Sequence, residues 1–211
     1  MNPWVALGLA YAIGALPTAY LAGRLHGIDL RQHGSGNLGA TNVVRVLGWP
    51  VGLVVYVIDC LKGFLPAWWL PIACRLAGPV AMWWAIAFGV AAIVGHVKPI
   101  WLLFRGGGKG VATASGVFFG LAPAATAGVT VLFLLIVALT RYVSLGSMLG
   151  ALALPVFVYL DQGATPVFLI SVAVGAFVVW THRANIARLR AGTESKIGRA
   201  KAVPTAAKEV P

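Results

Sequence analysis

The chain has 211 residues, of which 60% are hydrophobic and only 10% are charged, and its mean hydropathy is +0.89. So few charges cannot cover a soluble domain of this length, so the composition predicts one domain folded in a lipid bilayer. The sixteen lysines and arginines, against five acidic residues, are spread singly between apolar runs. This distribution argues against nucleic-acid binding, which requires a clustered basic face, and fits basic loops on one side of a membrane.

The hydrophobic stretches set the expected architecture, because a helix needs about 20 apolar residues to cross the hydrocarbon core. Stretches of this kind lie at 3–22, 50–73, 79–104, 111–139, 143–160 and 164–181. The stretch 111–139 is too long for one ordinary span and contains Gly120 and Pro123, so we expect two segments with a bend between them. The sequence therefore predicts an all-α polytopic bundle of about seven transmembrane helices, and a count of five stays open.

The loops predict the orientation of this bundle. The first stretch lacks the basic start of a signal peptide, so we expect it to be retained as a span. Most basic residues fall in segments that this arrangement places on one side: 24–48, 105–110, 140–142 and the tail from 182. The positive-inside rule then puts the N-terminus outside and the C-terminus in the cytoplasm. We expect a single transmembrane domain at 1–190 and a polar, flexible cytoplasmic tail at 191–211.

The first basic loop carries an unusual polar stretch, HGSGNLGATNVVR, at residues 33–45. A helix that starts near Ala40 would offer free N–H groups and a positive dipole end to an anion. Arg45, one turn later, can bind a phosphate through two hydrogen bonds. Helix packing explains the glycines, but it does not explain the polar side chains beside them. We therefore expect an anion site formed by Ser35, Gly36, Asn37, Thr41, Asn42 and Arg45.

The second glycine-rich loop is FRGGGKGVATASG, at residues 104–116. A nucleotide-binding P-loop needs Ser or Thr after its lysine and a preceding strand. Here Gly110 follows Lys109 between two apolar helices, so we do not expect nucleotide binding. Successive backbone N–H groups can still form an anion nest in any fold. We expect phosphate to be bound by Gly106, Gly107, Gly108, Lys109 and Thr113.

A charged pair interrupts the second hydrophobic stretch. A lysine near the middle of a membrane costs roughly 2.5–3.5 kcal/mol on insertion scales. Asp59 and Lys62 are three residues apart and so share a helical face, which predicts an ion pair. We expect this pair to support the site or the bundle, and a direct catalytic role is an equal alternative. His96, at the end of the next stretch, is either structural or part of the site.

The last hydrophobic stretch ends in WTHRANIARLRAGTESK. If its helix continues, His182 and Asn185 lie on one face, and Glu194 follows further along. A basic flank on the anionic leaflet accounts for Arg183, Arg188 and Arg190, but not for the histidine and asparagine.

These motifs, in this order, resemble those of the bacterial integral membrane glycerol-3-phosphate acyltransferases, the PlsY family. The similar segments are GSGNLGATNVVR, DCLKG, GHVKP…FRGGGKGVAT, TRYVSLGS and HRANIARLRAGTESKIG. Leu38 stands where many members have proline, and the glycine run contains one additional glycine. The resemblance implies acyl transfer from acyl phosphate to the sn-1 hydroxyl of glycerol 3-phosphate. The products would be lysophosphatidic acid and phosphate, in the first step of phospholipid synthesis at the bacterial inner membrane.

The resemblance also implies roles for the residues named above. It assigns the reaction site to Ser35, Arg45, Lys109, His182 and Asn185. The acyl phosphate would be held by Asn37, Thr41, Asn42 and the backbone of Gly106, Gly107 and Gly108. From the residues themselves, and not from the resemblance, we expect supporting roles for Asp59, Lys62, His96 and Glu194. We favour direct attack by the acceptor hydroxyl with Ser35 orienting a substrate, and leave open a covalent acyl-serine.

The other expected partners are membrane lipid and, as an open question, the enzyme that makes the acyl phosphate. Because the five carboxylates are scattered, we expect no metal ion and no cofactor. The main alternative function is a membrane transporter of a phosphorylated metabolite. It is disfavoured because the polar motifs gather at one membrane face instead of lining a midplane pathway between repeats.

Overall fold

The computed structural model describes residues 1–198, in which all regular structure is helical. The elements are α1 (Pro3–Gly14), α2 (Thr18–Leu25), the 3₁₀ helix η1 (Leu30–Gln32), α3 (Ala40–Leu47), α4 (Trp49–Ala73), α5 (Gly78–Val97), the 3₁₀ helix η2 (Ile100–Leu102), α6 (Val111–Leu121), α7 (Pro123–Thr140), α8 (Val143–Gln162), α9 (Pro166–Thr181) and α10 (Arg183–Arg190). The predicted all-α membrane fold is confirmed.

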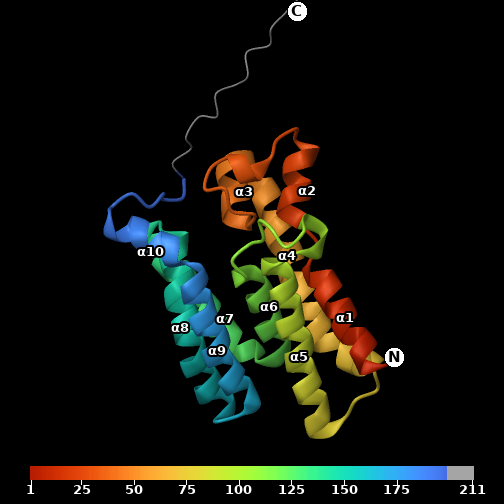
Figure 1. Cartoon of the computed structure of the whole chain (residues 1–211). Helices are drawn as coiled ribbons and strands as arrows, with labels where there is room; N and C mark the ends of the chain where they lie inside the picture. The colour runs from red at the N-terminus through yellow and green to blue at the C-terminus, as the bar shows by residue number, and fades with distance from the viewer. Residues whose placement is uncertain (199–211) are drawn as a thin grey trace, which may run out of the picture.

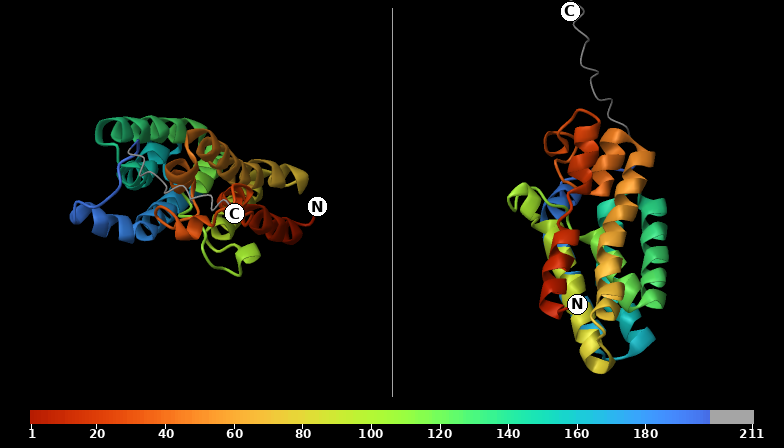
Figure 2. Two further views of the ribbon diagram at one scale, coloured as in Figure 1. Left: turned by 90° about the horizontal axis from the view of Figure 1, so that it is seen from above. Right: turned by 90° about the vertical axis from the view of Figure 1, so that its right-hand side faces the viewer.

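The long helices form two groups that stand side by side (Figure 1). One group contains α1, α4, α5 and α6, and the other contains α7, α8 and α9. The short helices α2, α3 and α10 gather at one end, together with the loop between α5 and α6. The N-terminus and the α4–α5 and α8–α9 connections lie at the opposite end (Figures 1 and 2). The glycine-rich loops predicted from the sequence therefore meet at a single end of the bundle.

The stretch 111–139 divides where the sequence predicted a break. α6 ends at Leu121 and α7 begins at Pro123, whose ring cannot continue the preceding hydrogen-bond ladder. α6 and α7 thus run in opposite directions, and both loops that flank them lie at the basic end.

The described residues contain five segments long and apolar enough to cross a membrane, or six if the α9–α10 pair, bent by 55°, is one span. The first of them combines α1 with α2, and the shorter α6 has 11 residues. The number of crossings and the orientation stay predictions.

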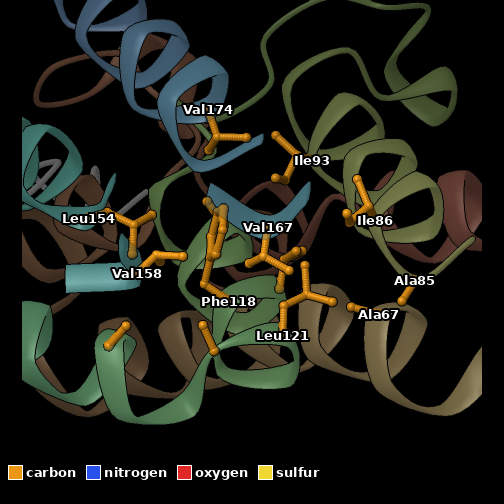
Figure 3. Close-up of a cluster of buried hydrophobic side chains, with 14 of the residues drawn as sticks. Ala67, Ala85, Ile86, Ile93, Phe118, Leu121, Leu154, Val158, Val167 and Val174 are labelled. Carbon is orange, nitrogen blue, oxygen red and sulfur yellow. The ribbon is translucent and has the colours of Figure 1, made fainter. Parts of the chain in front are cut away.

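The largest cluster of buried apolar side chains joins the two groups (Figure 3). Phe118 and Leu121 of α6 pack in this cluster with Leu154 of α8 and Val167 of α9. Large apolar side chains also cover the outside of the bundle; Leu139, for example, is 85% exposed. Lipid is the solvent that such an outer surface requires.

α4 and α6 approach each other to backbone contact. Gly63 of α4 faces the Thr113 carbonyl, and Gly116 of α6 faces the Cys60 carbonyl. A Cβ atom at either glycine would overlap that carbonyl. Small residues permit such close approach between membrane helices. This contact fixes the start of α6, and therefore the preceding loop, relative to α4.

Residues 191–198 belong to the predicted flexible tail, yet they return to the helical bundle. Glu194 is buried at 6% exposure, and the backbone of Ile197 exchanges hydrogen bonds with Arg141. The remainder of the predicted tail, 199–211, lies outside the described residues, so the division at residue 190 stays a prediction.

The α4–α6 contact can be tested by adding one methyl group. We expect Gly116→Ala to lower the free energy of unfolding by about 1–3 kcal/mol, because the new Cβ would overlap the Cys60 carbonyl. The matched control is Gly8→Ala in α1, where a Cβ meets no atom within 4 Å. This control should be neutral or stabilising by up to about 1 kcal/mol. Thermal unfolding in detergent measures both, and equal shifts would contradict the close contact.

Candidate active site

The first polar loop is organised around one buried amide. Asn42, which is 2% exposed, accepts the Ser35 backbone N–H through Oδ1 at 2.8 Å. Its Nδ2 donates to the carbonyls of Leu30 at 3.3 Å and His33 at 3.1 Å. Gly34 has a φ of 62°, and a Cβ there would overlap the Asn42 amide oxygen. The Asn42 side chain is therefore committed to shaping the loop, although the sequence predicted that it binds phosphate.

The remaining residues predicted in this loop are at least partly exposed. Ser35 is exposed, and Asn37 and Thr41 are half-buried. Arg45 donates through Nη2 to the carbonyl of Ser195, at 3.1 Å. Its Nε is buried, and within residues 1–198 it has no hydrogen-bond partner. Arg45 therefore retains a donor that an anion could use.

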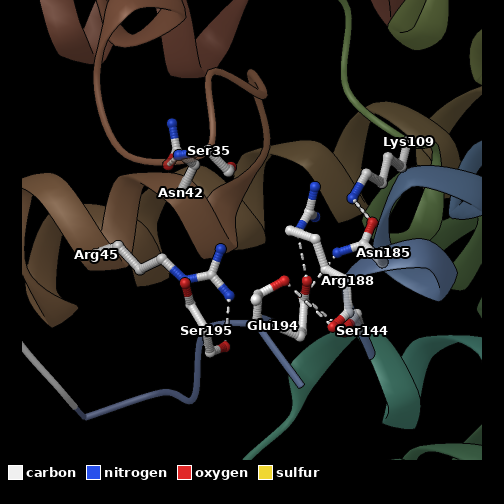
Figure 4. A network of polar contacts seen from close by, with 10 residues as sticks. Ser35, Asn42, Arg45, Lys109, Ser144, Asn185, Arg188, Glu194 and Ser195 are labelled. Atoms are coloured by element: carbon white, nitrogen blue, oxygen red, sulfur yellow. Dashed lines mark hydrogen bonds and ion pairs between the residues drawn. The ribbon is translucent and has the colours of Figure 1, made fainter. Parts of the chain in front are cut away.

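The second loop and the last helix form a continuous hydrogen-bond network (Figure 4). The Lys109 ammonium donates to Oδ1 of Asn185. Asn185 Nδ2 donates to Glu194 Oε1 at 2.7 Å, and the same oxygen accepts the Ser144 hydroxyl at 2.8 Å. Arg188 Nε donates to Glu194 Oε2 at 2.6 Å. The network fixes Lys109 against α8 and α10.

Three cationic side chains, those of Arg45, Lys109 and Arg188, gather around Glu194, across from Ser35 (Figure 4). The single carboxylate of this network is that of Glu194, so this group of side chains has an excess of positive charge. Arg188 was not predicted as a site residue, because its place in a basic flank suggested only membrane anchoring. The available signal was its spacing of three from Asn185, which places both on one helical face.

Lys109 and Glu194, two of the ionisable groups of the network, have shifted pKa values. Burial, reinforced by the charge of Arg188, lowers the pKa of the Lys109 ammonium to about 8. Burial on its own would raise the pKa of Glu194, but hydrogen bonds from Asn185, Arg188 and Ser144 bring it below its usual value. At neutral pH the site therefore contains a carboxylate and an ammonium group close to its titration range.

Neither Ser35 nor its neighbours form a catalytic pair. Within residues 1–198, no histidine or carboxylate is hydrogen-bonded to the Ser35 hydroxyl. The Nδ1 atom of His33 lies 2.9 Å from the Asp29 carbonyl instead. His182, which is 3% exposed, directs Nδ1 to the Val178 carbonyl at 2.7 Å. That contact leaves Nε2 as the acceptor of a neutral His182 ring.

The glycine loop lies on the end of α5. Gly108 donates its N–H to the His96 carbonyl at 3.2 Å, so that group is already bonded. In the described residues the N–H groups of Gly106 and Gly107 have no intramolecular acceptor, which leaves them available to an anion. Thr113 is fully buried with an unpartnered hydroxyl and so lies away from the surface of the site.

An apolar groove of about 670 Å³ runs alongside this site between the two helical groups. Its walls come from α4, α6, α7, α8 and α9 and include Tyr56, Phe118, Val129, Phe133, Leu154 and Val174. Four hydroxyl groups in the walls each donate to the carbonyl four residues earlier in their own helix: Ser115, Thr126, Thr130 and Ser147. Val111 and Val178 also line the groove, so it reaches the vicinity of Lys109 and His182.

These features define a class of protein: an integral membrane protein that binds an anionic ligand at one end of a helical bundle, next to an apolar groove. The family model for glycerol-3-phosphate acyltransferase matches residues 4–192. The chain belongs to the glycerol-3-phosphate acyltransferase family of integral membrane enzymes, which confirms the resemblance seen in the motifs. This family membership favours an enzyme over the alternative of a transporter.

Curated relatives and solved structures agree with the family match. A glycerol-3-phosphate acyltransferase of Trichlorobacter lovleyi is 46% identical over 195 residues, covering 92% of this chain and 95% of the relative. One of Geobacter sulfurreducens is 44% identical, covering 93% and 98%. The crystal structure of the integral membrane glycerol 3-phosphate acyltransferase PlsY, in its glycerol 3-phosphate form, superposes with a TM-score of 0.85 at 36% identity, covering 93% of this chain and 96% of PlsY. The lysophosphatidic acid form of PlsY gives a TM-score of 0.82 at 35% identity, covering 93% and 95%.

The pKa of Lys109 makes a prediction about pH. The ammonium is present below about pH 8 and is lost as pH rises through that value. We therefore expect kcat/KM to fall above pH 8, since kcat/KM reports ionisations of the free enzyme. In Lys109→Arg, whose guanidinium stays protonated, this limb should move to higher pH. A pH profile of both proteins measures the effect, and an unmoved limb would assign the ionisation to another group.

Proposed function

We propose that the protein transfers a fatty acyl group from acyl phosphate to the sn-1 hydroxyl of glycerol 3-phosphate. The products are lysophosphatidic acid and inorganic phosphate. The observation that carries this proposal is the position of the three cations beside the end of the apolar groove. Both substrates contain phosphate, and only the donor has a long apolar tail. The solved forms of PlsY, with glycerol 3-phosphate and with lysophosphatidic acid, support the acceptor and the product.

Acyl phosphate fits the geometry as donor. The serine and threonine hydroxyl groups of the groove are already hydrogen-bonded and its walls are otherwise mainly apolar, so an acyl chain can lie against them without leaving these groups unpaired. Burying some fifteen methylene groups at about 0.8 kcal/mol each stabilises the bound tail by roughly 12 kcal/mol relative to water. The lipid phase offers the same stabilisation, so the protein needs only to recognise and align the headgroups.

Direct attack suits a site in which Ser35 has no partner base. The sn-1 hydroxyl oxygen forms a bond to the acyl carbonyl carbon, and the carbon–oxygen bond to the phosphate breaks. The hydroxyl proton passes to the departing phosphate, so charge and atoms balance. Alignment of the two reactants in one site supplies several kcal/mol of the barrier reduction.

The site residues divide between the two phosphates. Arg45, Lys109 and Arg188 neutralise phosphate charge, with Lys109 at the phosphate of glycerol 3-phosphate. The N–H groups of Gly106 and Gly107 add hydrogen bonds to the donor. Asn37 and Thr41 border the donor phosphate from the first loop. Ser35, His182 Nε2 and Asn185 orient the acceptor. Asn42 and Glu194 shape the loops that carry these groups.

The charge distribution supports a cytoplasmic site in the bacterial inner membrane. The end of the bundle that contains α2, α3 and α10 holds most of the basic residues, whereas the other end has Arg75 in the α4–α5 connection and Asp161 in the last turn of α8 (Figure 1). Basic loops remain preferentially in the cytoplasm. Glycerol 3-phosphate would then reach the site from the cytoplasm.

The reaction can be tested with palmitoyl phosphate and glycerol 3-phosphate as substrates of the purified protein. We expect equal amounts of phosphate and lysophosphatidic acid from the wild-type protein. Removal of one charge-assisted phosphate contact in Arg45→Ala or Lys109→Ala should lower kcat/KM by about 10–150-fold, for a loss of about 1.5–3 kcal/mol. Folding of each variant is checked by thermal unfolding. Phosphate release without lysophosphatidic acid would contradict transfer, and an acyl-serine trapped with donor alone would contradict direct attack.

The groove makes a separate prediction about the donor. Val129 lines the groove, whereas Val131, on the same helix, is 57% exposed on the outer surface. We expect Val129→Phe to lower kcat/KM for palmitoyl phosphate more than for a short-chain acyl phosphate, because the ring narrows the groove. Val131→Phe makes the same change in volume and should leave the chain-length preference unaltered. If both variants had the same chain-length preference for the acyl phosphate, the groove would not be the acyl site.

A further inference from the structure

A buried ion pair ties α4 to the break between α1 and α2. Asp59 and Lys62 are 1% and 4% exposed, and Lys62 Nζ lies 2.8 Å from Asp59 Oδ1, as their spacing predicted. Lys62 also donates at 2.8 Å to the carbonyl of Leu16, which lies in the link between α1 and α2. The Thr18 hydroxyl, in the first turn of α2, donates to Asp59 Oδ1 at 2.5 Å. The pair thus joins α4 to the residues that follow α1 and to the first turn of α2.

The same carboxylate faces a histidine under the glycine loop. His96 is 6% exposed, and its Nδ1 lies 3.8 Å from Asp59 Oδ1. The other side of the imidazole ring contacts Gly108, where a Cβ atom would overlap Nε2. The His96 carbonyl accepts the Gly108 N–H, and Gly107 lies against the carbonyls of His96 and Val97. His96 therefore supports the loop through both its side chain and its backbone.

A small cavity separates the ion pair from the loop. It is open to solvent, has a volume of about 220 Å³ including the space at its mouth, and is bordered by Lys62, His96 and the three glycines of the loop. No atom of the loop bonds to Asp59 or Lys62, so the pair acts on the loop through His96. Lys109 follows the last of these glycines directly in the chain.

Stability alone does not account for charges at this place. Apolar side chains of similar volume often stabilise a protein at least as well as a buried ion pair. An ion pair instead imposes one geometry on its partners, because an unpaired buried charge is costly. Here the ion pair fixes the position of His96, against which Gly107 and Gly108 pack.

We propose that Asp59, Lys62 and His96 are positioning residues. They hold the glycine loop in the position, relative to α4 and α5, that places the Lys109 ammonium at the phosphate of glycerol 3-phosphate. This inference rests on the proposed function, in which Lys109 binds that phosphate. None of the three residues touches a substrate. Their effect on the reaction passes through the contact between the His96 ring and Gly108.

The contact can be tested by a double-mutant cycle. Gly108→Ala places a methyl group into the imidazole ring, and His96→Ala removes the ring. We expect the KM for glycerol 3-phosphate to rise about tenfold in His96→Ala and about a hundredfold in Gly108→Ala, with smaller changes in kcat. The double variant should return to within about threefold of His96→Ala, because coupled residues are not additive. His26→Ala, which removes an exposed histidine at the end of α2, is the matched control and should leave KM unchanged.

Binding of glycerol 3-phosphate, measured as its shift of the thermal midpoint, distinguishes the possible failures. If Lys109→Ala retains the full shift, the proposed role of Lys109 fails and the inference fails with it. If Lys109→Ala loses the shift while His96→Ala keeps both the shift and the KM, only the positioning role is overturned. Equal impairment of Gly108→Ala and the double variant would also overturn it.

Thr18→Val provides the same test if His96→Ala does not fold. It removes a hydrogen bond to Asp59 without leaving a buried charge unpaired. We expect a rise of about threefold in the KM for glycerol 3-phosphate. This is smaller than the direct cost of losing a hydrogen bond to a charged group, about 10–150-fold, because the effect reaches the site only through His96. An unchanged KM in a folded Thr18→Val protein would overturn the proposal.

Discussion

One buried carboxylate holds together the groups that form the anion site. Glu194 accepts hydrogen bonds from Ser144 of α8 and from Asn185 and Arg188 of α10, and Asn185 accepts one from Lys109. Burying a carboxylate is destabilising unless its oxygens accept hydrogen bonds. The hydrogen-bond partners of Glu194 are therefore held in one arrangement. Without it, two of the three cations would lose their fixed positions relative to the first loop. The positively charged side chains that attract phosphate are thus held in place by the negatively charged carboxylate of Glu194.

The bundle separates two physical tasks between its end and its length. The polar end recognises headgroups through charge and through backbone N–H groups. The groove offers apolar walls whose hydroxyl groups are already bonded within their helices. The close α4–α6 contact and the break at Ala122 connect the polar end with the groove, because they place the start of α6 beside both. Glycine is required at this junction for backbone contact and not for flexibility.

Local sequence pattern predicted those features that depend on neighbouring residues. The all-helical fold, the break between Gly120 and Pro123 and the Asp59–Lys62 ion pair each follow from composition or from spacing along one helix. The motifs also located Arg45, Lys109 and Asn185, which the structure brings to one end of the bundle. Features that depend on contacts between distant segments were not accessible in this way. The commitment of the Asn42 amide to the carbonyls of Leu30 and His33 is one example. The contribution of Arg188 is another, because its partner Glu194 lies beyond the helix, in a segment whose composition predicted a flexible tail.

The hydrogen bond from Arg45 to the Ser195 carbonyl joins residues that are 150 positions apart. During synthesis at about 5–20 residues per second, roughly 8–30 s separate the appearance of these two residues. Throughout this interval the first loop and α3 already exist, but Asn185, Arg188 and Glu194 do not all exist. A partly inserted chain can therefore fold its early helices without being able to assemble the full ring of cations. Acyl transfer becomes possible only after Glu194 has left the ribosome, so the order of translation itself delays activity until this segment has been made.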